Sequence, residues 1–415
     1  MKNRTALAVS CLAAALSLSL AAAPATPAEE ALAARLPAVY ARCAAQYRGL
    51  LARMADQKPG MQPKRWQDGR LVVVPPQDWC SGFFPGSLWF LYEQTGDAFW
   101  KDAATRFTDA LLEPLRHDAN NHDVGFRTYC SAGHALRLTK DPKYAAFLHD
   151  TAAALRTRYD DGLGLIRSWD SPKKGAGYFT PPFIVIIDNM MNLELLEWDA
   201  KNGGDPKSDR ISRSQADLTD RHHFRPDGSA YHILGYNRRT RKVHGVYAGQ
   251  GACVEGAWAR GQSWAVYGFT MMYRETRDPK YLARAVKCAD YWMNEPNLPA
   301  DGVAYWDFKA AEIPNEPRDA SAAAVTASAL LELGALLPAG QGARYRAFGV
   351  KILSSLASDA YLAPAGENGN FLLMHSVGNK PGWYENPRSG EVDVPLNYAD
   401  YYFLEALGRF GRLVK

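Results

Sequence analysis

Hydrophobic residues recur along this chain with a helical period, in segments of two alternating kinds. One kind is amphipathic, as in residues 281–292, where apolar side chains at helical spacing leave one face polar. The other kind, as in residues 320–337, is apolar or small on most sides and is typical of a buried helix. The pattern predicts outer amphipathic helices alternating with inner buried ones. The expected helices cover residues 30–57, 84–95, 97–117, 124–138, 141–159, 183–200, 204–222, 257–275, 278–295, 319–336, 342–358 and 397–412.

Similar short turns join each inner helix to the next outer one. Thr95-Gly96-Asp97, Thr139-Lys140-Asp141-Pro142 and Thr276-Arg277-Asp278-Pro279 share the pattern, with a related turn at 203–207 and a looser copy at 339–345. Asp followed by Pro suits a helix start, because the carboxylate caps the first turn and proline fits the first helical position.

The first helix lacks an inner partner and the last inner helix lacks an outer one, so closing the chain into a ring pairs them. We therefore expect an all-α fold, an (α/α)6 toroid of six helical hairpins, as one domain over residues 26–415. An open helical solenoid is the alternative. In the ring, the long outer-to-inner connections share one end with the N-termini of the inner helices, where functional loops and an anionic ligand are expected.

The first 25 residues have the pattern of a secretory signal peptide. Lys2 and Arg4 precede an apolar run over residues 6–20, and small residues follow at 21–25. The run is too short to favour a permanent membrane span, and the rest of the chain contains no other candidate. We expect a periplasmic or secreted protein with no membrane partner, present as a monomer or weak dimer.

Charge and cysteine content exclude several partners. The net charge of +4 is small for 415 residues and its cations are scattered, which argues against nucleic acid. The five cysteines that follow the signal segment are odd in number and lack metal or disulfide-framework spacing, so buried free thiols are expected. The histidines and aspartates form no cluster with metal spacing, and we expect neither a metal nor another cofactor.

Two aspartates are the candidate catalytic residues. Asp188 lies in the apolar segment 182–198, which we interpret as a helix buried on all sides with Asp188 about one turn in. A buried ionised carboxylate is costly, so it serves either a hydrogen-bonded structure or chemistry. Asp123 either caps the helix that follows it or supplies a second acid at the same end of the ring. Two converging acids are the usual arrangement for sugar hydrolysis.

Several polar and aromatic residues in the same connections are candidate sugar contacts. Trp79 can stack on a sugar face or plug the mouth of the barrel. A hairpin expected over residues 230–247, with its turn at 237–241, carries His232 and leads to Gln250. Arg260 can bind a substrate carboxylate or form an ion pair with one of the two candidate acids.

Long motifs in these positions make the chain similar to a known family. It resembles the unsaturated glucuronyl hydrolases, glycoside hydrolase family 88, over nearly the whole mature chain. The resemblance implies an α/α six-hairpin barrel, with the general acid/base at Asp188 and a second essential carboxylate at Asp123. The motifs that carry it are Trp79-Cys80-Ser81-Gly82-Phe83-Phe84-Pro85-Gly86, His122-Asp123-Val124-Gly125-Phe126, Ile187-Asp188-Asn189-Met190-Met191-Asn192, Trp258-Ala259-Arg260-Gly261-Gln262-Ser263-Trp264, Asp319-Ala320-Ser321-Ala322-Ala323-Ala324 and Tyr398-Ala399-Asp400-Tyr401-Tyr402-Phe403-Leu404-Glu405-Ala406-Leu407.

The resemblance also implies a substrate and its contacts. The substrate would be an oligosaccharide with a 4,5-unsaturated uronic acid at its non-reducing end, as left by polysaccharide lyases. Family members carry acidic residues between the glutamine and the Trp-Ala-Arg motif, whereas this chain has Gly251-Ala252-Cys253-Val254-Glu255-Gly256. An unsaturated rhamnogalacturonyl hydrolase and a non-catalytic glycan-binding toroid remain as alternatives. The implied sugar contacts are Trp79, His122, His232, Gln250, Trp258, Arg260 and Trp264.

Overall fold

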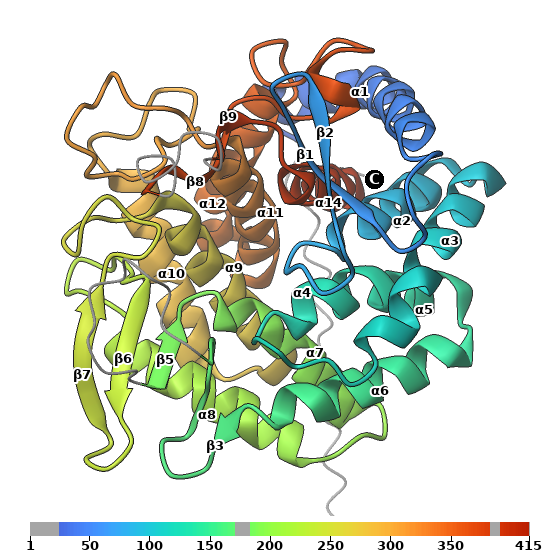
Figure 1. The fold of residues 1–415 in the computed structure, drawn as a ribbon. Coiled ribbons are helices and arrows are strands. Elements are labelled where there is room, and N and C mark those ends of the chain that lie inside the picture. Colours follow the sequence, from blue (N-terminus) through green and yellow to red (C-terminus); the bar gives the residue numbers. More distant parts are fainter. Residues whose placement is uncertain (1–24, 171–182, 382–390, 415) are drawn as a thin grey trace, which may run out of the picture.

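The computed structural model describes residues 25–170, 183–381 and 391–414, and helices dominate it (Figure 1). A π-helical turn, η1 (Tyr129–Gly133), separates α4 from α5, and a short 3-10 turn, η2 (Asn368–Asn370), precedes β8. The α-helices are α1 (Pro27–Arg53), α2 (Phe83–Thr95), α3 (Ala98–Leu115), α4 (Val124–Thr128), α5 (His134–Thr139), α6 (Pro142–Arg156), α7 (Asn189–Lys201), α8 (Lys207–His222), α9 (Ala259–Thr276), α10 (Pro279–Asn294), α11 (Ala320–Leu336), α12 (Ala339–Leu356) and α14 (Asn397–Leu413).

The inner helices form a closed ring. In ring order, α2, the α4–η1–α5 unit, α7, α9, α11 and α14 each contact the next, and α14 contacts α2 again. The first twelve residues of α11 are all buried, and most are alanine or serine, because this helix has protein on both sides. Helices α1, α3, α6, α8, α10 and α12 lie outside this ring (Figure 1).

The first helix closes the ring as expected. Helix α1 packs on α12 and α14, so the N-terminal helix supplies the outer partner that the last inner helix lacks along the chain. Tyr47 of α1 donates a hydrogen bond to Asp400 of α14 at 3.2 Å, a contact across 353 residues of sequence. The (α/α)6 toroid is confirmed, and the open solenoid is wrong.

The repeated turns have the geometry that their residues predict. Asp97, Asp141 and Asp278 cap α3, α6 and α10, each accepting a hydrogen bond from the backbone N–H two residues later. The preceding helices end in left-handed residues, for example Gly96. The fifth turn differs from the expected one: α11 ends at Leu336 and α12 already begins at Ala339, so the chain turns before residues 339–345.

In the part of the chain that the structure describes, nine short strands lie in the outer-to-inner connections. They form antiparallel pairs β1–β2, β3–β4 and β8–β9 and a three-stranded sheet in the order β5-β6-β7. The β6–β7 pair confirms the expected hairpin. Within the described residues, the strands are β1 (Gln62–Gln67), β2 (Arg70–Val74), β3 (Tyr159–Asp160), β4 (Leu165–Ile166), β5 (Phe183–Ile186), β6 (Ile233–Asn237), β7 (Lys242–Tyr247), β8 (Ser376–Asn379) and β9 (Glu391–Val394).

The segment expected to be one helix over residues 183–200 is a strand followed by a helix. Residues 183–186 form β5, fully buried and paired with β6, and α7 begins only at Asn189. The physical reason is the β-branched run Ile184-Val185-Ile186, which suits a strand buried on both faces. Asp188 is therefore the residue that precedes α7, and it does not lie one turn inside a helix.

All five cysteines in the described residues are free thiols. Cys43, Cys80 and Cys288 are buried, as expected, whereas Cys130 is half-buried and Cys253 is exposed, contrary to the expectation of buried thiols. None of the helices in the described residues is long and apolar enough to span a membrane. The signal segment, residues 1–25, lies almost wholly outside the described residues, so its expected role stays a prediction.

Candidate active site

The two candidate acids lie at the same end of two neighbouring inner helices. Asp123 immediately precedes α4 and Asp188 immediately precedes α7, and each side chain is near-buried, with the residue 8% exposed. Gly125 packs so tightly on α7 that a Cβ there would lie 2.8 Å from the Cα of Asn192. The Phe126 N–H also donates to the Asn192 side-chain oxygen at 3.0 Å. These contacts hold the first turns of α4 and α7 together, and with them the two carboxylates.

Neither carboxylate is used to cap its helix. Both residues occupy the N-cap position, yet neither side chain accepts a hydrogen bond from the first turn. A capping role for Asp123, which the sequence left open, is therefore not what the structure shows. Carboxylates at two helix N-termini, held near-buried without serving the helices, have the placement of groups kept for a ligand or a reaction.

Each acid has an imidazole beside it. His122 Nε2 lies 3.3 Å from Asp123 Oδ1, and His232 Nε2 lies 3.7 Å from Asp188 Oδ2. The backbone N–H of Gln250 donates to His232 Nδ1 at 2.8 Å, so Nδ1 carries no proton. The neutral ring of His232 therefore has its proton on Nε2, the nitrogen that faces Asp188.

Gly249 allows this contact. Its backbone is left-handed, with φ +59°, and a Cβ there would lie 2.1 Å from His232 Nδ1. Only glycine lets the chain approach the imidazole so closely without a clash. The hairpin β6–β7 and the turn after it thus fix the tautomer and the position of His232.

Trp258 and Arg260 extend the site from α9. The ring of Trp258 lies against His232, with centroids 4.4 Å apart, and the Arg260 guanidinium lies 4.6 Å from the Trp258 ring centroid. Arg260 is 1% exposed and forms an ion pair with Asp319 at 3.2 Å. The alternative expectation that Arg260 pairs with Asp123 or Asp188 is wrong, because Asp319 at the start of α11 takes that position.

Arg260 and Gln250 both hold strand β8. The guanidinium donates to the backbone oxygens of Val377 and Gly378, the latter at 2.6 Å, and Gln250 Nε2 donates to the same Gly378 oxygen at 2.7 Å. Arg260 Nε makes no hydrogen bond with any residue that the structure describes. One buried N–H of Arg260 thus remains for another partner.

The expected aromatic contacts fall into two groups. Trp79 is half-buried, with its ring centroid 4.8 Å from that of Tyr398, and its expected contact with a sugar stays a prediction. Trp264 is fully buried between Phe126 and Tyr402 and presents no face to solvent. Its indole N–H has no hydrogen-bond acceptor among the described residues.

Two residues of the site were missed in the sequence as candidates. Tyr398 is fully buried between Trp79 and Arg260, and its hydroxyl has no partner in the part of the chain that the structure describes. Asp319 orients Arg260 and caps α11 at the same time. Both residues could have been recognised from the sequence, because each is the first residue of a motif at the start of an inner helix. In residues 25–170, 183–381 and 391–414, no group of three or more His, Cys, Asp or Glu side chains is placed to hold a metal.

Comparisons with known proteins agree with this geometry. No family model matches the chain. An unsaturated glucuronyl hydrolase of Formosa agariphila is 44% identical over 342 residues, which are 82% of each chain. The crystal structure of an unsaturated glucuronyl hydrolase specific for heparin is 42% identical, with a TM-score of 0.83 over 90% of this chain and 97% of the other. A structure of an unsaturated glucuronyl hydrolase (UGL) with dGlcA-Glc-Rha-Glc is 28% identical, with a TM-score of 0.80 over 90% of this chain and 97% of that one.

Sequence identity across most of both chains, the shared helical ring and two acids at the starts of neighbouring inner helices lead to one conclusion: the chain belongs to the unsaturated glucuronyl hydrolases, a family of glycoside hydrolases.

Proposed function

We propose that this enzyme removes a 4,5-unsaturated uronic acid from the non-reducing end of oligosaccharides produced by polysaccharide lyases. The observation that carries the proposal is the pair of near-buried carboxylates, Asp123 and Asp188, at the N-termini of adjacent inner helices. Relatives support the substrate class, since one acts on heparin and another is seen with dGlcA-Glc-Rha-Glc.

The reaction is hydration of a vinyl ether. Protonated Asp188 gives its proton to C4 while the electrons of the C4=C5 double bond form the new C4–H bond, and positive charge develops at C5 and the ring oxygen. Water attacks C5 and loses a proton to the Asp188 carboxylate, which restores the acid. The hemiketal then opens at the bond between C5 and the ring oxygen, giving a ketone at C5. The hemiacetal left at C1 collapses to an aldehyde and releases the neighbouring sugar.

The residues around Asp188 have separate roles in this scheme. His232 presents an Nε2–H toward the Asp188 carboxylate, which stabilises the anion after the first proton transfer. Asp123 accepts hydrogen bonds from ring hydroxyls of the substrate. One acid performs both proton transfers, so the rule that relates carboxylate separation to inversion or retention does not apply.

The test follows the double bond directly. Unsaturated disaccharides derived from chondroitin, hyaluronan, heparin, ulvan and gellan are incubated with the enzyme, and the ultraviolet absorbance of the conjugated double bond is followed. We expect absorbance to decay with the true substrate class and Asp188→Asn to abolish the decay while leaving the circular dichroism spectrum unchanged. Asp97→Asn is the matched control, because Asp97 caps an outer helix at the other end of the ring and asparagine caps equally well. Full activity of Asp188→Asn would refute the assignment.

Asp123→Asn separates the proposal from its nearest alternative. Asparagine keeps the shape of the side chain and one oxygen that accepts a hydrogen bond from a sugar hydroxyl, but it removes the negative charge of residue 123. We expect a loss of about 10- to 100-fold in kcat/KM, because a hydrogen bond from a ring hydroxyl to a charged carboxylate contributes about 1.5–3 kcal/mol. Unchanged kcat/KM would instead favour an unsaturated rhamnogalacturonyl hydrolase, in which a single acid suffices.

We also propose that the protein is exported. Support comes from the basic, apolar and small-residue order of residues 1–25, and α1 begins shortly after it, at Pro27. Fractionation of an expressing bacterial host tests this: the mature chain is expected in the periplasm or medium, and retention in the cytoplasm with residues 1–25 uncut would contradict it.

A further inference from the structure

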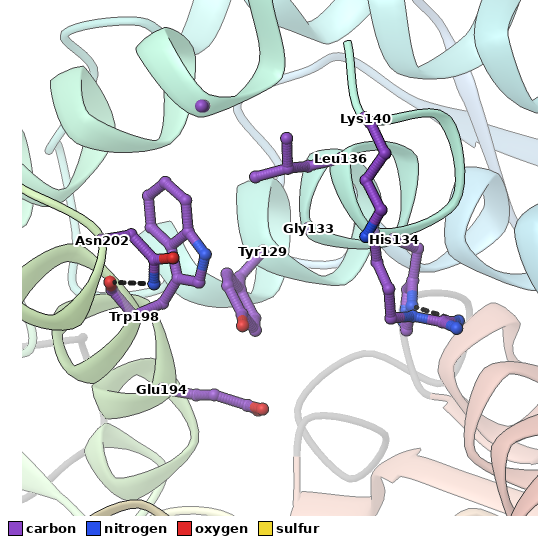
Figure 2. A pocket seen from close by; sticks show the side chains of 10 residues that line it. Tyr129, Gly133, His134, Leu136, Lys140, Glu194, Trp198 and Asn202 are labelled. Carbon is purple, nitrogen blue, oxygen red and sulfur yellow. Dashed lines mark hydrogen bonds between the residues drawn. The ribbon is translucent and has the colours of Figure 1, made fainter. Parts of the chain in front are cut away.

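A pocket apart from the candidate active site lies at the end of α7 that is opposite to Asp188, and we call it the distal pocket. It has a volume of about 610 Å³, within the range of small-molecule sites, and is lined by residues of η1, α5, α6 and α7 (Figure 2). Trp198, in its wall, follows Asp188 by ten residues, which places it about 15 Å further along the helix axis at 1.5 Å per residue. The pocket is therefore separate from the acids.

The wall of this pocket contains a π-helical turn. Residues Tyr129–Gly133 interrupt the second inner helix between α4 and α5, and such turns are rare and frequently found at functional sites. Tyr129 opens the turn and its ring lines the pocket. Gly133 leaves space for that ring, since a Cβ there would lie 3.2 Å from Tyr129 Cδ2. The irregular turn thus places Tyr129 in the pocket wall.

The other walls carry groups of the kinds that bind sugars in proteins. Trp198 and Asn202 lie on one side, the Lys140 side chain lies on the opposite side, and the Glu194 carboxylate lies below Tyr129 (Figure 2). His149 packs against Trp198 with ring centroids 4.8 Å apart and holds the indole in place. Aromatic rings pack on the apolar faces of sugars, while a carboxylate and an amide bind hydroxyl groups.

The charge left in this pocket is positive. Lys140, the left-handed residue after α5, forms no ion pair with the residues that the structure describes. Arg137 is paired with Glu93, and Glu194 is paired with Arg274. Burial and the nearby Arg137 hold the pKa of His134 at about 3, so this ring is neutral, with Nδ1 beside Arg137 and Nε2 2.8 Å from the Tyr401 hydroxyl. Lys140 therefore supplies an ammonium that a ligand anion can neutralise.

We propose that this pocket, formed around Tyr129, Trp198 and Lys140, is a second saccharide site that binds an anionic sugar. The sugar ring packs on Trp198 and Tyr129, its hydroxyls donate to Glu194, and its carboxylate or sulfate pairs with Lys140. The choice of a uronic acid as the probe rests on the proposed function, but binding in this pocket is measured separately from the catalytic reaction.

The test uses the indole N–H signals of the full-length enzyme in ¹H–¹⁵N spectra. Trp198→Phe identifies the Trp198 signal by its disappearance. Sodium glucuronate is titrated to about 10 mM, well above a Kd of about 1 mM, with neutral glucose as the comparison and a glucuronate-containing hexasaccharide to distinguish a glycan chain from a monosaccharide. We expect the Trp198 signal to move in a saturable manner with glucuronate or the hexasaccharide, and at least tenfold more weakly with glucose.

Variants of two lysines decide the role of the charge. Lys140→Ala is expected to weaken anion binding at Trp198 by at least tenfold, whereas Lys207→Ala, an exposed lysine outside the pocket, leaves it unchanged. A Trp198 signal that stays fixed with both anionic ligands, or that moves equally in Lys140→Ala, overturns the proposal. The Trp198 signal reports binding in the distal pocket only, whereas the decay of ultraviolet absorbance reports the reaction at Asp188. Failure of the proposed reaction and failure of the proposed second site are therefore distinguished.

Discussion

At the scale of single residues, the site depends on contacts between residues distant in the sequence. The pairing of Arg260 with Asp319 is an example, since 59 residues separate them and only the ring brings α9 and α11 together. From the sequence, Arg260 could be placed at the correct end, but its ion-pair partner could not be identified. The family resemblance also implied a sugar contact for Trp264, although its ring is fully buried between Phe126 and Tyr402.

Gly249 offers a test of how closely His232 must be held. Gly249→Ala places a methyl group 2.1 Å from His232 Nδ1, so the imidazole must move away from residue 249, which changes its position relative to Asp188 and breaks the hydrogen bond from the Gln250 N–H. A displacement of this size is expected to lower kcat/KM by about 100-fold. Gly96→Ala is the control, because Gly96 has a similar φ of +67° and no atom within 4 Å of its Cβ position. Both variants lose about 1–2 kcal/mol of stability from left-handed strain, so equal activities would refute the assignment.

Tyr398 can be tested by removing one oxygen atom. Its hydroxyl has no partner among the described residues, so Tyr398→Phe removes no hydrogen bond of the free protein and is expected to leave the thermal midpoint unchanged or slightly higher. If the hydroxyl binds substrate, kcat/KM falls about tenfold, the value of one hydrogen bond of about 1.4 kcal/mol. Steady-state kinetics and thermal unfolding measured together check this, and a fall in stability at constant kcat/KM would contradict it.

At the scale of elements, the segment before α7 shows where sequence patterns fail. Residues 183–187 are all apolar, so their periodicity cannot distinguish a buried strand from a buried helix. The partner strand β6 lies about 50 residues further along the chain, which no local pattern reveals. The β-branched residues favour the strand, and with it Asp188 moves to the junction of strand and helix. The repeated Asp caps were predictable because each depends on neighbouring residues only.

Asp400 on α14 anchors the segment that precedes β8, and it makes stability depend on pH. It accepts hydrogen bonds from the backbone N–H groups of Leu372 and Leu373, both at 2.9 Å. Burial raises its pKa from 3.8 to about 7. Between pH 4 and 7 the folded protein keeps a proton that the unfolded chain releases, so this group makes the protein less stable as pH rises, by up to about 1.4 kcal/mol per pH unit.

Asp400→Asn removes this titration. The variant loses one backbone hydrogen-bond acceptor, which costs about 1–2 kcal/mol below about pH 4, where the parent carboxyl is protonated in both the folded and the unfolded state. Its thermal midpoint should fall less than that of the parent between pH 5 and pH 7, so the gap between the two narrows as pH rises. Differential scanning calorimetry at several pH values measures the gap, and a constant or widening gap would show that Asp400 does not titrate in this window.

At the scale of the whole molecule, the ring was predictable because alternation of inner and outer helices fixes it. The sequence leaves one helix without a hairpin partner at each end of the chain. These two helices, α1 and α14, pack against each other and close the ring. The distal pocket was not predictable, since it depends on a π-helical turn whose register depends on packing between α2, α6 and α7. The same applies to the ionic contacts that join the inner helices near their C-terminal ends.

Those ionic contacts connect four successive inner helices. Arg274 of α9 contacts Glu194 of α7 and, at 2.8 Å, Glu332 of α11, and Arg409 of α14 contacts Glu332 at 3.0 Å. Arg274→Met keeps the length of the side chain but leaves two carboxylates facing each other without their shared cation. Because the Arg274 side chain is only 23% exposed, the loss of stability is expected at about 2–3 kcal/mol, just below the range for a fully buried pair.

A second substitution distinguishes charge from packing in this network. In Arg274→Met combined with Glu194→Gln, the repulsion is removed while the cavity of the first change remains. We expect the double variant to recover more than half of the stability lost by Arg274→Met, measured by urea unfolding, because most of the cost of breaking a buried pair is the carboxylate left behind. Activity at the opposite end of the ring should be unaffected in any variant that remains folded. A double variant no more stable than Arg274→Met would show that Arg274 acts by filling space between the helices. The ionic contacts at this position would then contribute nothing to the stability of the ring.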